Sequence, residues 1–198
     1  MDKPWIERPR RIVTGHDAQG RSVIVSDGDA PVMVQADHAP SMGMAEIWRC
    51  DGLPPSNAGN ADGALLPFSL APATDGVICR VVHFPPDREL NWSADDANAT
   101  FAQFGGGEVM ANEGTRHAAF HRTQTLDFAV VLEGEIVAMM DVGETLMKPG
   151  DILVQRGTRH AWANRSARPC RVCFVAVSAE PLPRGNPGTA ALERAGAA

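Results

Sequence analysis

The sequence lacks three features that would place it in large functional classes: a long apolar run, a basic cluster and a full set of metal-binding cysteines. No stretch reaches the ~18 consecutive apolar residues that a membrane-spanning helix needs. No apolar segment follows the N-terminal residues 1–5 either, so we expect no secretory signal. From these two absences we expect a cytoplasmic location and no membrane partner.

Positive charge is also limited. The chain has 18 Lys and Arg against 24 Asp and Glu, a formal net charge of -6, and its basic residues do not form a cluster interleaved with aromatic ones. This balance argues against binding to phosphate backbones, so we expect no nucleic-acid partner. With 198 residues, of which 44% are hydrophobic, the chain is long enough to bury a core without disulfide or metal crosslinks.

Cysteine is scarce, with four residues at positions 50, 79, 170 and 173. Cys170 and Cys173 form a CxxC pair, but a structural zinc site normally needs a second such pair or nearby histidines. The segment around the pair resembles a strand, on which residues three apart point to opposite faces. We therefore interpret them as ordinary buried or half-buried thiols, with a zinc or redox pair as the alternative.

What the chain does contain is a series of short β-like segments. Residues 10–36 resemble short strands joined by polar turns, and Val77–Phe84 is a strand that two prolines stop. Between residues 120 and 178, short strands alternate with glycine-containing turns, which is typical of a sandwich or barrel. No long amphipathic helix is evident. The polar segments 51–64 and 87–114 are predicted either to form a lid or to be disordered.

The first of two motifs runs from residue 121 to residue 134 and resembles the first motif of the cupin superfamily. Cupins have two histidines two residues apart, then a glutamate, then a glycine. This chain keeps His121 and Gly134, and it places Thr123 at the second histidine and Asp127 at the glutamate.

The second motif covers residues 150–164 and resembles the second cupin motif. It is one residue shorter than usual between its two glycines and lacks the usual proline before the second of them. It keeps Gly150, Gly157, His160 and Asn164. Together the two segments cover about a third of the chain.

The resemblance implies an all-β fold, a cupin (RmlC-like) jelly-roll β-barrel with extra N-terminal strands. The barrel would span residues 76–180. Residues 1–75 would form an extension of short strands and loops that packs on the barrel or on a dimer partner, and residues 181–198 a tail. Single-domain cupins commonly pair through sheet edges and exchanged N-terminal strands, so a homodimer is expected.

The resemblance also implies a metal site. In cupins three histidines and one glutamate usually hold a metal ion, and Thr123 removes one of these imidazoles here. The ligands that remain are His121, Asp127 and His160. Two histidines and one carboxylate with open positions suit Fe(II), and Mn and Zn are also compatible. The alternative is a metal-free pocket that binds a small molecule.

Other residues near the motifs have predicted roles. Thr123 and Trp162 are expected to line the substrate pocket, since they share strand parity with His121 and His160. His117 lies ~13 Å from His121 on a regular strand, so it would join the site only if the chain bulges. His83 would either line the barrel or lie in the core. A proton shuttle, if the reaction needs one, would be His117 or His83.

The remaining candidates are surface histidines, a turn residue and three arginines. His16 and His38 are expected at the surface, and Asp151 is expected to cap the turn that contains Gly150. One arginine beside the motif histidines could bind a substrate carboxylate, although Arg122 and Arg159 are out of phase with their neighbouring histidines. The arginines in question are Arg116, Arg122 and Arg159.

The function that the resemblance implies is that of a metal-dependent enzyme. Its substrate would be a small organic acid or a polyketide-like intermediate. The reaction would be that of a decarboxylase, dehydratase, isomerase or dioxygenase, with the metal as a Lewis acid. The alternative is a metal-free cupin that binds a small molecule without catalysis.

Overall fold

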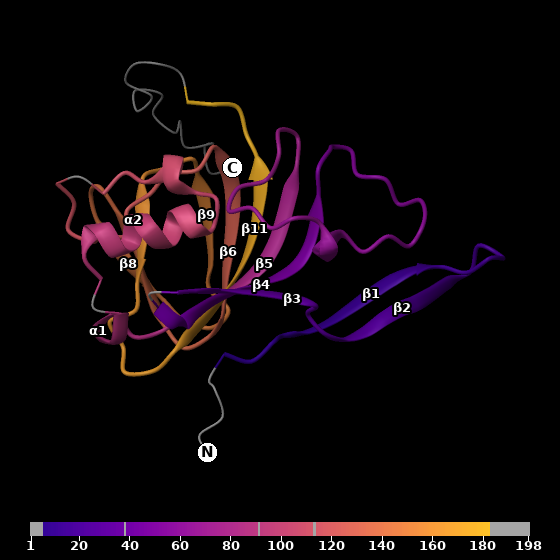
Figure 1. Cartoon of the computed structure of the whole chain (residues 1–198), viewed down its shortest axis with the longest axis horizontal. Helices are drawn as coiled ribbons and strands as arrows, with labels where there is room; N and C mark the ends of the chain where they lie inside the picture. Colours follow the sequence, from indigo (N-terminus) through magenta and orange to yellow (C-terminus); the bar gives the residue numbers. More distant parts are fainter. Residues whose placement is uncertain (1–5, 38, 91, 113, 183–198) are drawn as a thin grey trace, which may run out of the picture.

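The protein is described by a computed structural model over residues 6–37, 39–90, 92–112 and 114–182. His38 and most of the predicted tail lie outside the described residues. Two antiparallel sheets enclose the barrel, and a separate two-stranded hairpin precedes them (Figure 1). Within the described part of the chain, no helix is long and apolar enough to cross a membrane. The predicted all-β fold class with extra N-terminal strands is confirmed.

The larger sheet has six strands in the order β3-β4-β5-β11-β6-β9, and every pairing is antiparallel. The smaller sheet has the order β10-β7-β8. The larger sheet consists of β3 (Val32–Ala36), β4 (Ala39–Cys50), β5 (Val77–Phe84), β11 (Cys170–Ser178), β6 (Thr125–Glu133) and β9 (Ile152–Arg156). The smaller sheet consists of β10 (His160–Ala163), β7 (Ile136–Met140) and β8 (Glu144–Met147).

Strand alternation decides which side chains enter the barrel. On β6 the residues at odd positions from Thr125 to Val131 are buried, whereas Phe128 and Leu132 are exposed. This period of two is that of a strand with one face on a core. At the end of β6, Gly134 has a φ of 74°, and a Cβ there would collide with the carbonyl oxygen of Pro169. The motif glycine is therefore required by both backbone conformation and close approach.

The described part of segment 87–114, where the sequence predicted a polar lid or disorder, contains two α-helices and one 3-10 helix. They are α1 (Asp87–Leu90), α2 (Ala94–Gln103) and η2 (Gly107–Val109). Ser93 caps α2 and forms a capping box with Asp96. The sequence pattern did not show this helix because its apolar side is narrow: Ala97 and Phe101 are buried, and most other positions are exposed. The helix brings Phe101 to the mouth of the barrel.

The N-terminal extension divides into two parts. Its strands β3 and β4 extend the larger sheet, with β4 paired to β5. Strands β1 (Arg10–His16) and β2 (Ser22–Asp29) pair with each other and project away from the barrel (Figure 1). This hairpin exposes apolar side chains, with Ile24 63% exposed. Part of segment 51–64 packs beside it, since Asp62 forms an ion pair with Arg11 of β1.

Candidate active site

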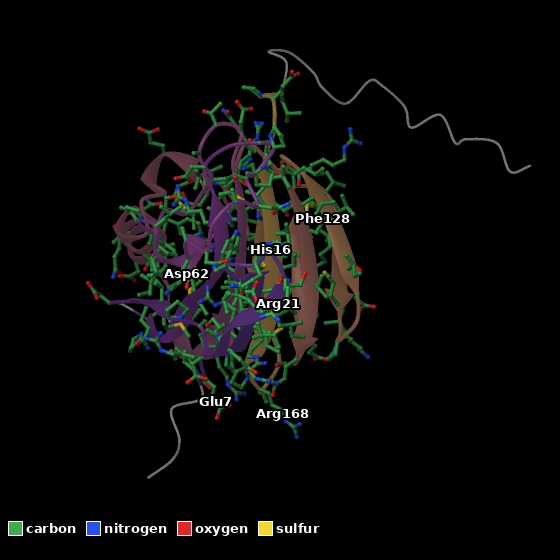
Figure 2. All side chains as sticks on the ribbon, turned by 90° about the vertical axis from the view of Figure 1, so that its right-hand side faces the viewer. Glu7, His16, Arg21, Asp62, Phe128 and Arg168 are labelled. Carbon is green, nitrogen blue, oxygen red and sulfur yellow. The ribbon has the colours of Figure 1, made fainter. Side chains whose placement is uncertain are left out.

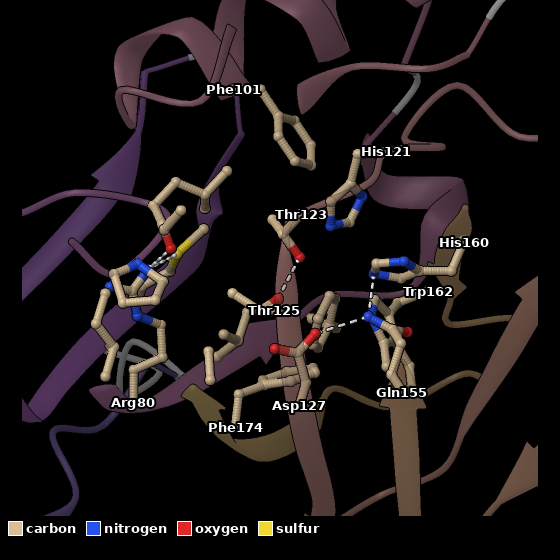
Figure 3. Close-up of a pocket in the computed structure, with 18 of the residues that line it drawn as sticks. Arg80, Phe101, His121, Thr123, Thr125, Asp127, Gln155, His160, Trp162 and Phe174 are labelled. Atoms are coloured by element: carbon tan, nitrogen blue, oxygen red, sulfur yellow. Dashed lines mark hydrogen bonds between the residues drawn. The ribbon is translucent and has the colours of Figure 1, made fainter. Parts of the chain in front are cut away.

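A cavity of about 110 Å³ lies inside the barrel and is called the barrel pocket below. One wall carries six polar side chains, namely His121, Thr123, Thr125, Asp127, Gln155 and His160, and Figure 3 shows them together. Much of the remaining lining is apolar and includes Met42, Met44, Leu70, Ile78, Val82, Phe84, Phe101, Trp162 and Phe174. A concave apolar site with a few converging polar groups is the usual form of a small-molecule site.

The backbone holds His121 and His160 next to each other, with their rings tilted by 55°. The two residues lie directly opposite each other and exchange both backbone hydrogen bonds, with N–O distances of 2.9 and 3.0 Å. Side chains of directly opposite residues in antiparallel strands lie on the same face. The imidazole centroids are accordingly 4.2 Å apart, and Phe101 lies 4.7 Å from the His121 ring.

Backbone carbonyls fix the tautomer of both rings. The Nδ1 of His121 donates to the Ala119 oxygen at 2.9 Å, and the Nδ1 of His160 donates to the Thr158 oxygen at 2.8 Å. Burial lowers the pKa of His121 to about 4 and lowers the pKa of His160 well below its ordinary value. Both rings are therefore neutral near pH 7, and each presents Nε2 as a hydrogen-bond acceptor.

Asp127 and Gln155 also belong to this polar wall. They are opposite residues of β6 and β9, and the Gln155 Nε2 donates to the Asp127 Oδ2 at 2.9 Å. The same Gln155 nitrogen lies 3.0 Å from the Nε2 of His160. Since both partners accept, the amide NH₂ group bridges the carboxylate and the imidazole. Asp127 is 6% exposed, and its Oδ1 has no hydrogen-bond partner among the described residues.

The pKa of the Asp127 carboxyl is raised. Burial is the main cause, and the neighbouring Thr125 hydroxyl and Gln155 amide oppose it. A neutral carboxyl would present an O–H group to the pocket at Oδ1, whereas the carboxylate would present an acceptor. Asp127 can therefore give or take a proton at the atom that lacks a partner.

The three predicted metal ligands do not fit a three-ligand site as they lie here. Among the residues that the structure describes, no group of three His, Cys, Asp or Glu side chains is arranged to hold a metal ion. The Gln155 amide separates Asp127 from His160 and occupies the His160 lone pair. Metal binding by His121, Asp127 and His160 stays a prediction.

A buried ion pair forms another part of the pocket wall. The Arg80 guanidinium donates to Glu46 at 2.9 Å, to the Ser69 oxygen at 2.7 Å and to the Leu70 oxygen at 3.2 Å. It also lies 4.6 Å from the Phe68 ring centroid. Burial raises the pKa of Glu46, although the attraction of Arg80 opposes this. Arg80 therefore holds segment 68–71 against the barrel.

Arg80→Met is expected to destabilise the protein by about 3–5 kcal/mol, because it leaves the Glu46 carboxyl buried without its partner. Urea unfolding measures the change. The double variant Glu46→Met/Arg80→Met serves as the control and should recover most of the loss. A single variant that is no less stable than the double variant would contradict this account.

The predicted pocket residues Thr123 and Trp162 both line the barrel pocket. The Thr123 and Thr125 hydroxyl oxygens are 2.6 Å apart, and the Trp162 and Phe174 ring centroids are 5.2 Å apart in an edge-to-face arrangement.

The predicted shuttle histidines lie outside the barrel pocket. His83 is fully buried on the face of β5 opposite to that of Arg80 and Val82, which line the pocket. His117 lies in the turn before His121, where its Nδ1 accepts from the Ala119 N–H at 3.2 Å.

The remaining candidate residues lie outside the barrel pocket. His16 is exposed, and the Asp151 carboxylate accepts from the Lys148 N–H at 2.8 Å, as expected for a turn cap. Arg116 bonds to Glu144 and to backbone carbonyls, and Arg159 donates to the Ala111 oxygen. None of Arg116, Arg122 and Arg159 lines the barrel pocket.

The two cysteines of the CxxC pair lie on opposite faces of strand β11. Cys170 is buried in the core, whereas Cys173 lies on the other face of β11 with its Sγ 3.9 Å from that of Cys79. The two residues of the pair do not share a face, as the strand parity predicts.

Sequence reasoning missed Gln155, Arg80 and Phe101. Gln155 shares the inward parity of Leu153 on β9, but an isolated glutamine gives no motif signal. Arg80 belongs to the even positions of Val77–Phe84, and both faces of this strand are covered: Val81 and His83 are buried as well as Arg80 and Val82.

Comparison with known proteins gives a family match. The sequence profile of the family described as "Cupin domain" matches residues 107–177. This range contains the six polar residues of the pocket wall, whereas Arg80 and Phe101 lie outside it.

Relatives match most of the chain. The phomopsin biosynthesis cluster protein C' of Diaporthe leptostromiformis is 31% identical over 186 residues, which cover 91% of this chain and 84% of that protein. A cupin-domain-containing oxidoreductase of Aspergillus ruber is 29% identical over 86% of this chain and 72% of its own length. Another, from Hypocrea virens, is 26% identical over 90% of this chain and 80% of its own length.

Proposed function

This chain belongs to the cupin superfamily, and on that basis we propose that it is an enzyme of natural-product biosynthesis that moves a proton between carbon and oxygen of a neutral cyclic ketone or enol. The predicted resemblance is thereby confirmed. The biosynthetic context comes from the names of the relatives, which belong to a biosynthesis cluster or are called oxidoreductases. The proposed reaction is inferred from the side chains of the candidate active site.

One observation carries the proposal: His121 and Asp127 both line the same largely apolar pocket, and each has one side-chain atom available for proton transfer. The Nδ1 of His121 is fixed by the Ala119 carbonyl, which leaves Nε2 as the acceptor. The Oδ1 of Asp127 lacks a partner among the described residues. Their pKa values are shifted in opposite directions, downward for His121 and upward for Asp127. Opposite shifts of this kind favour the neutral imidazole as a base and the neutral carboxyl as an acid within one site.

The proposed step is enolisation. The Nε2 of His121 takes a proton from the carbon next to the carbonyl, and neutral Asp127 gives its proton to the carbonyl oxygen. A C–H bond and a carboxyl O–H bond break, while an N–H bond and an enol O–H bond form. The products are the enol, an imidazolium and a carboxylate, and no electrons leave the ligand. The reverse step returns the ketone.

The lining favours a neutral ring over the small organic acid that the sequence predicted. Arg80, a basic side chain in the pocket lining, already donates to Glu46 and to two backbone carbonyls. A substrate carboxylate would have to displace these partners. Aromatic side chains from α2, β10 and β11 enclose the cavity. Its volume of about 110 Å³ is of the same order as the ~150 Å³ of an engineered cavity that binds benzene, so its size suits a small ring ketone.

Deuterium exchange tests the proposal without knowledge of the natural substrate. The protein is mixed with 2-indanone in D₂O, and loss of the C–H signal next to the carbonyl is followed by NMR. We expect exchange faster than in buffer. The matched control is Asp141→Asn, a surface carboxylate outside the pocket. Failure of 2-indanone, cyclohexanone and 2-tetralone to exchange above the buffer rate would contradict the proposed reaction.

We also propose that the partner of the chain is a second copy. The β1–β2 hairpin exposes Ile12 and Ile24, while the outer face of β6 and β9 exposes Phe128 and Ile152 (Figure 2 labels Phe128). The hairpin projects away from its own barrel. Exchange of hairpins between two copies would cover both apolar surfaces with one symmetric interface.

Light scattering after size-exclusion chromatography tests the dimer. Ile24→Asp is expected to shift the protein from dimer to monomer, because it places a charge in an apolar interface. Val142→Asp is the control, since Val142 is 92% exposed but lies on neither surface. A wild-type protein that runs as a monomer at micromolar concentration would contradict the proposal.

A further inference from the structure

The outer face of the larger sheet carries two thiols that the proposed reaction does not use. The Sγ atoms of Cys79 on β5 and Cys173 on β11 are 3.9 Å apart, and both residues are half-buried. Their chain neighbours Arg80 and Phe174 line the barrel pocket, so the thiols point to the opposite side of the sheet. They lie beside the outer face of β6 and β9 that the proposed dimer uses. The two thiols are therefore separate from the candidate active site.

The register of β5 and β11 brings the two sulfurs together. Cys79 lies opposite Val175 and Cys173 lies opposite Val81, so the cysteines occupy diagonal positions across one strand pair. Diagonal residues have Cα atoms about 7–8 Å apart, which is at the upper limit of what a disulfide spans. A bond between these sulfurs would need a small movement of both strands. Such a bond would be strained and easily reduced.

The two thiols differ in acidity. The hydrogen bond from the Cys79 thiol lowers the pKa of Cys173, although burial opposes this, and the same contact together with burial raises the pKa of Cys79. Cys173 therefore ionises first, and the thiolate is the reactive form of cysteine. Cys170 is buried in the core, where burial raises its pKa to about 12, so it is the less reactive residue of the CxxC pair.

We propose that Cys79 and Cys173 are an oxidation site, at which a hydroperoxide converts the two thiols into a reversible disulfide. A small oxidant suits the site, because both thiols are half-buried and a bulky disulfide reagent would have less access to them. The inference does not depend on the proposed enolisation. It gives Cys173 a partner on the neighbouring strand in place of Cys170.

The oxidation proceeds in two balanced steps. The Cys173 thiolate attacks one oxygen of the hydroperoxide, so an S–O bond forms and the O–O bond breaks, and the leaving alkoxide or hydroxide takes up a proton from solvent. The Cys79 sulfur then attacks the Cys173 sulfenic acid. An S–S bond forms, the S–O bond breaks, and the hydroxyl leaves as water with the Cys79 proton. The two sulfurs lose two electrons, which the hydroperoxide gains.

The disulfide would also act on the barrel pocket. Arg80 and Phe174 lie directly opposite each other, between the two cysteines in the register of β5 and β11. Both residues line the pocket. A movement that draws the sulfurs together on the outer face of the sheet therefore moves these two side chains on the inner face.

Peptide mass spectrometry tests the oxidation site. The reduced protein is treated with an equimolar amount of hydrogen peroxide, the remaining thiols are blocked with iodoacetamide, and cross-linked peptides are identified without reduction. We expect a disulfide between Cys79 and Cys173 in most chains, and we expect glutathione to remove it. A bond to Cys50 or Cys170 instead, or a protein whose thiols all stay free in excess peroxide, would overturn the proposal.

Single variants separate the roles of the two thiols. Cys79→Ser keeps a hydroxyl that can donate to Cys173, and it should stop the reaction at a sulfenic acid that dimedone traps. Cys173→Ser should consume peroxide at least about tenfold more slowly. Cys50→Ser is the matched control, because Cys50 is also half-buried and lies on the neighbouring strand β4. Equal peroxide consumption by Cys173→Ser and wild type would show that Cys173 is not the nucleophile.

The effect on the pocket has its own readout. Phe174 packs edge-to-face on Trp162, with ring centroids 5.2 Å apart. Oxidation should therefore shift the Trp162 indole N–H signal in the NMR spectrum of protein labelled with ¹⁵N-tryptophan, and it should not do so in Cys173→Ser. An unchanged Trp162 signal in fully oxidised wild type would overturn the link between the thiols and the pocket.

Discussion

His121→Asn lowers the rate of 2-indanone exchange by about 10²–10⁴-fold, the usual contribution of a positioned general base. The substitution is chosen because the asparagine amide can still donate to the Ala119 carbonyl, as the Nδ1 of His121 does at 2.9 Å. It removes Nε2, the atom that faces the ligand. The expected result is therefore a folded protein that binds the ring but does not exchange its C–H protons.

The pH profile provides a second readout. Because burial lowers the pKa of His121 to about 4, the base is present above that pH and is lost as the pH falls through 4. The raised pKa of Asp127 has the opposite effect, since the acid is lost as the pH rises through it. We therefore expect a bell-shaped profile in the NMR assay. A rate that rises as the pH passes through 6.5 would instead indicate an ordinary, exposed histidine.

The same shift affects stability. The folded-state pKa of His121 lies below its ordinary value of 6.5, so the unfolded state takes up the proton first as the pH falls. The contribution of the neutral ring to stability is full above pH 6.5 and is lost between 6.5 and about 4. Circular dichroism at each pH separates unfolding from loss of the base. His16→Asn, at an exposed histidine, should change neither the rate nor the stability.

Local sequence patterns predicted the parts of the fold that depend on near neighbours. Alternation on β6, the turn at Gly134 and the inward direction of Thr123 and Trp162 all follow from the period of two and from turn chemistry. Helix α2 was missed because Ala97 and Phe101 are too few to give a helical stripe. Its capping box, Ser93 with Asp96, was the signal that could have indicated it.

The chemistry of the site depends on contacts that no local pattern records. Asp127 and Gln155 are 28 residues apart and meet through the register of β6 and β9. The resemblance predicted that Asp127 binds a metal together with the two histidines. In the structure the Gln155 amide lies 3.0 Å from the Nε2 of His160 and occupies the lone pair that a metal would need. A metal site is defined by distances within a few tenths of an ångström, and spacing along the chain does not fix them.

Gln155→Glu is expected to make the pocket bind a divalent metal at least about tenfold more tightly than the wild-type protein does. The Gln155 amide nitrogen now lies within hydrogen-bond distance of both Asp127 and the Nε2 of His160. Its replacement by oxygen removes the donor that occupies the His160 lone pair. His121, His160 and the introduced carboxylate then form two histidines and one carboxylate, the set that suits Fe(II), Mn and Zn.

Charge adds to this effect. In the variant two carboxyl groups lie side by side in a buried wall, so one of them must stay protonated or a cation must bind between them. Mass spectrometry of the dialysed proteins measures retained iron, manganese and zinc, and calorimetry gives the affinities. Gln155→Leu removes the amide without adding a ligand and is the control. Addition of His160→Ala to Gln155→Glu should abolish the gain. If wild type already retains one metal ion per chain and loses it in His160→Ala, the amide does not block the site, and the metal-dependent prediction from the sequence is correct.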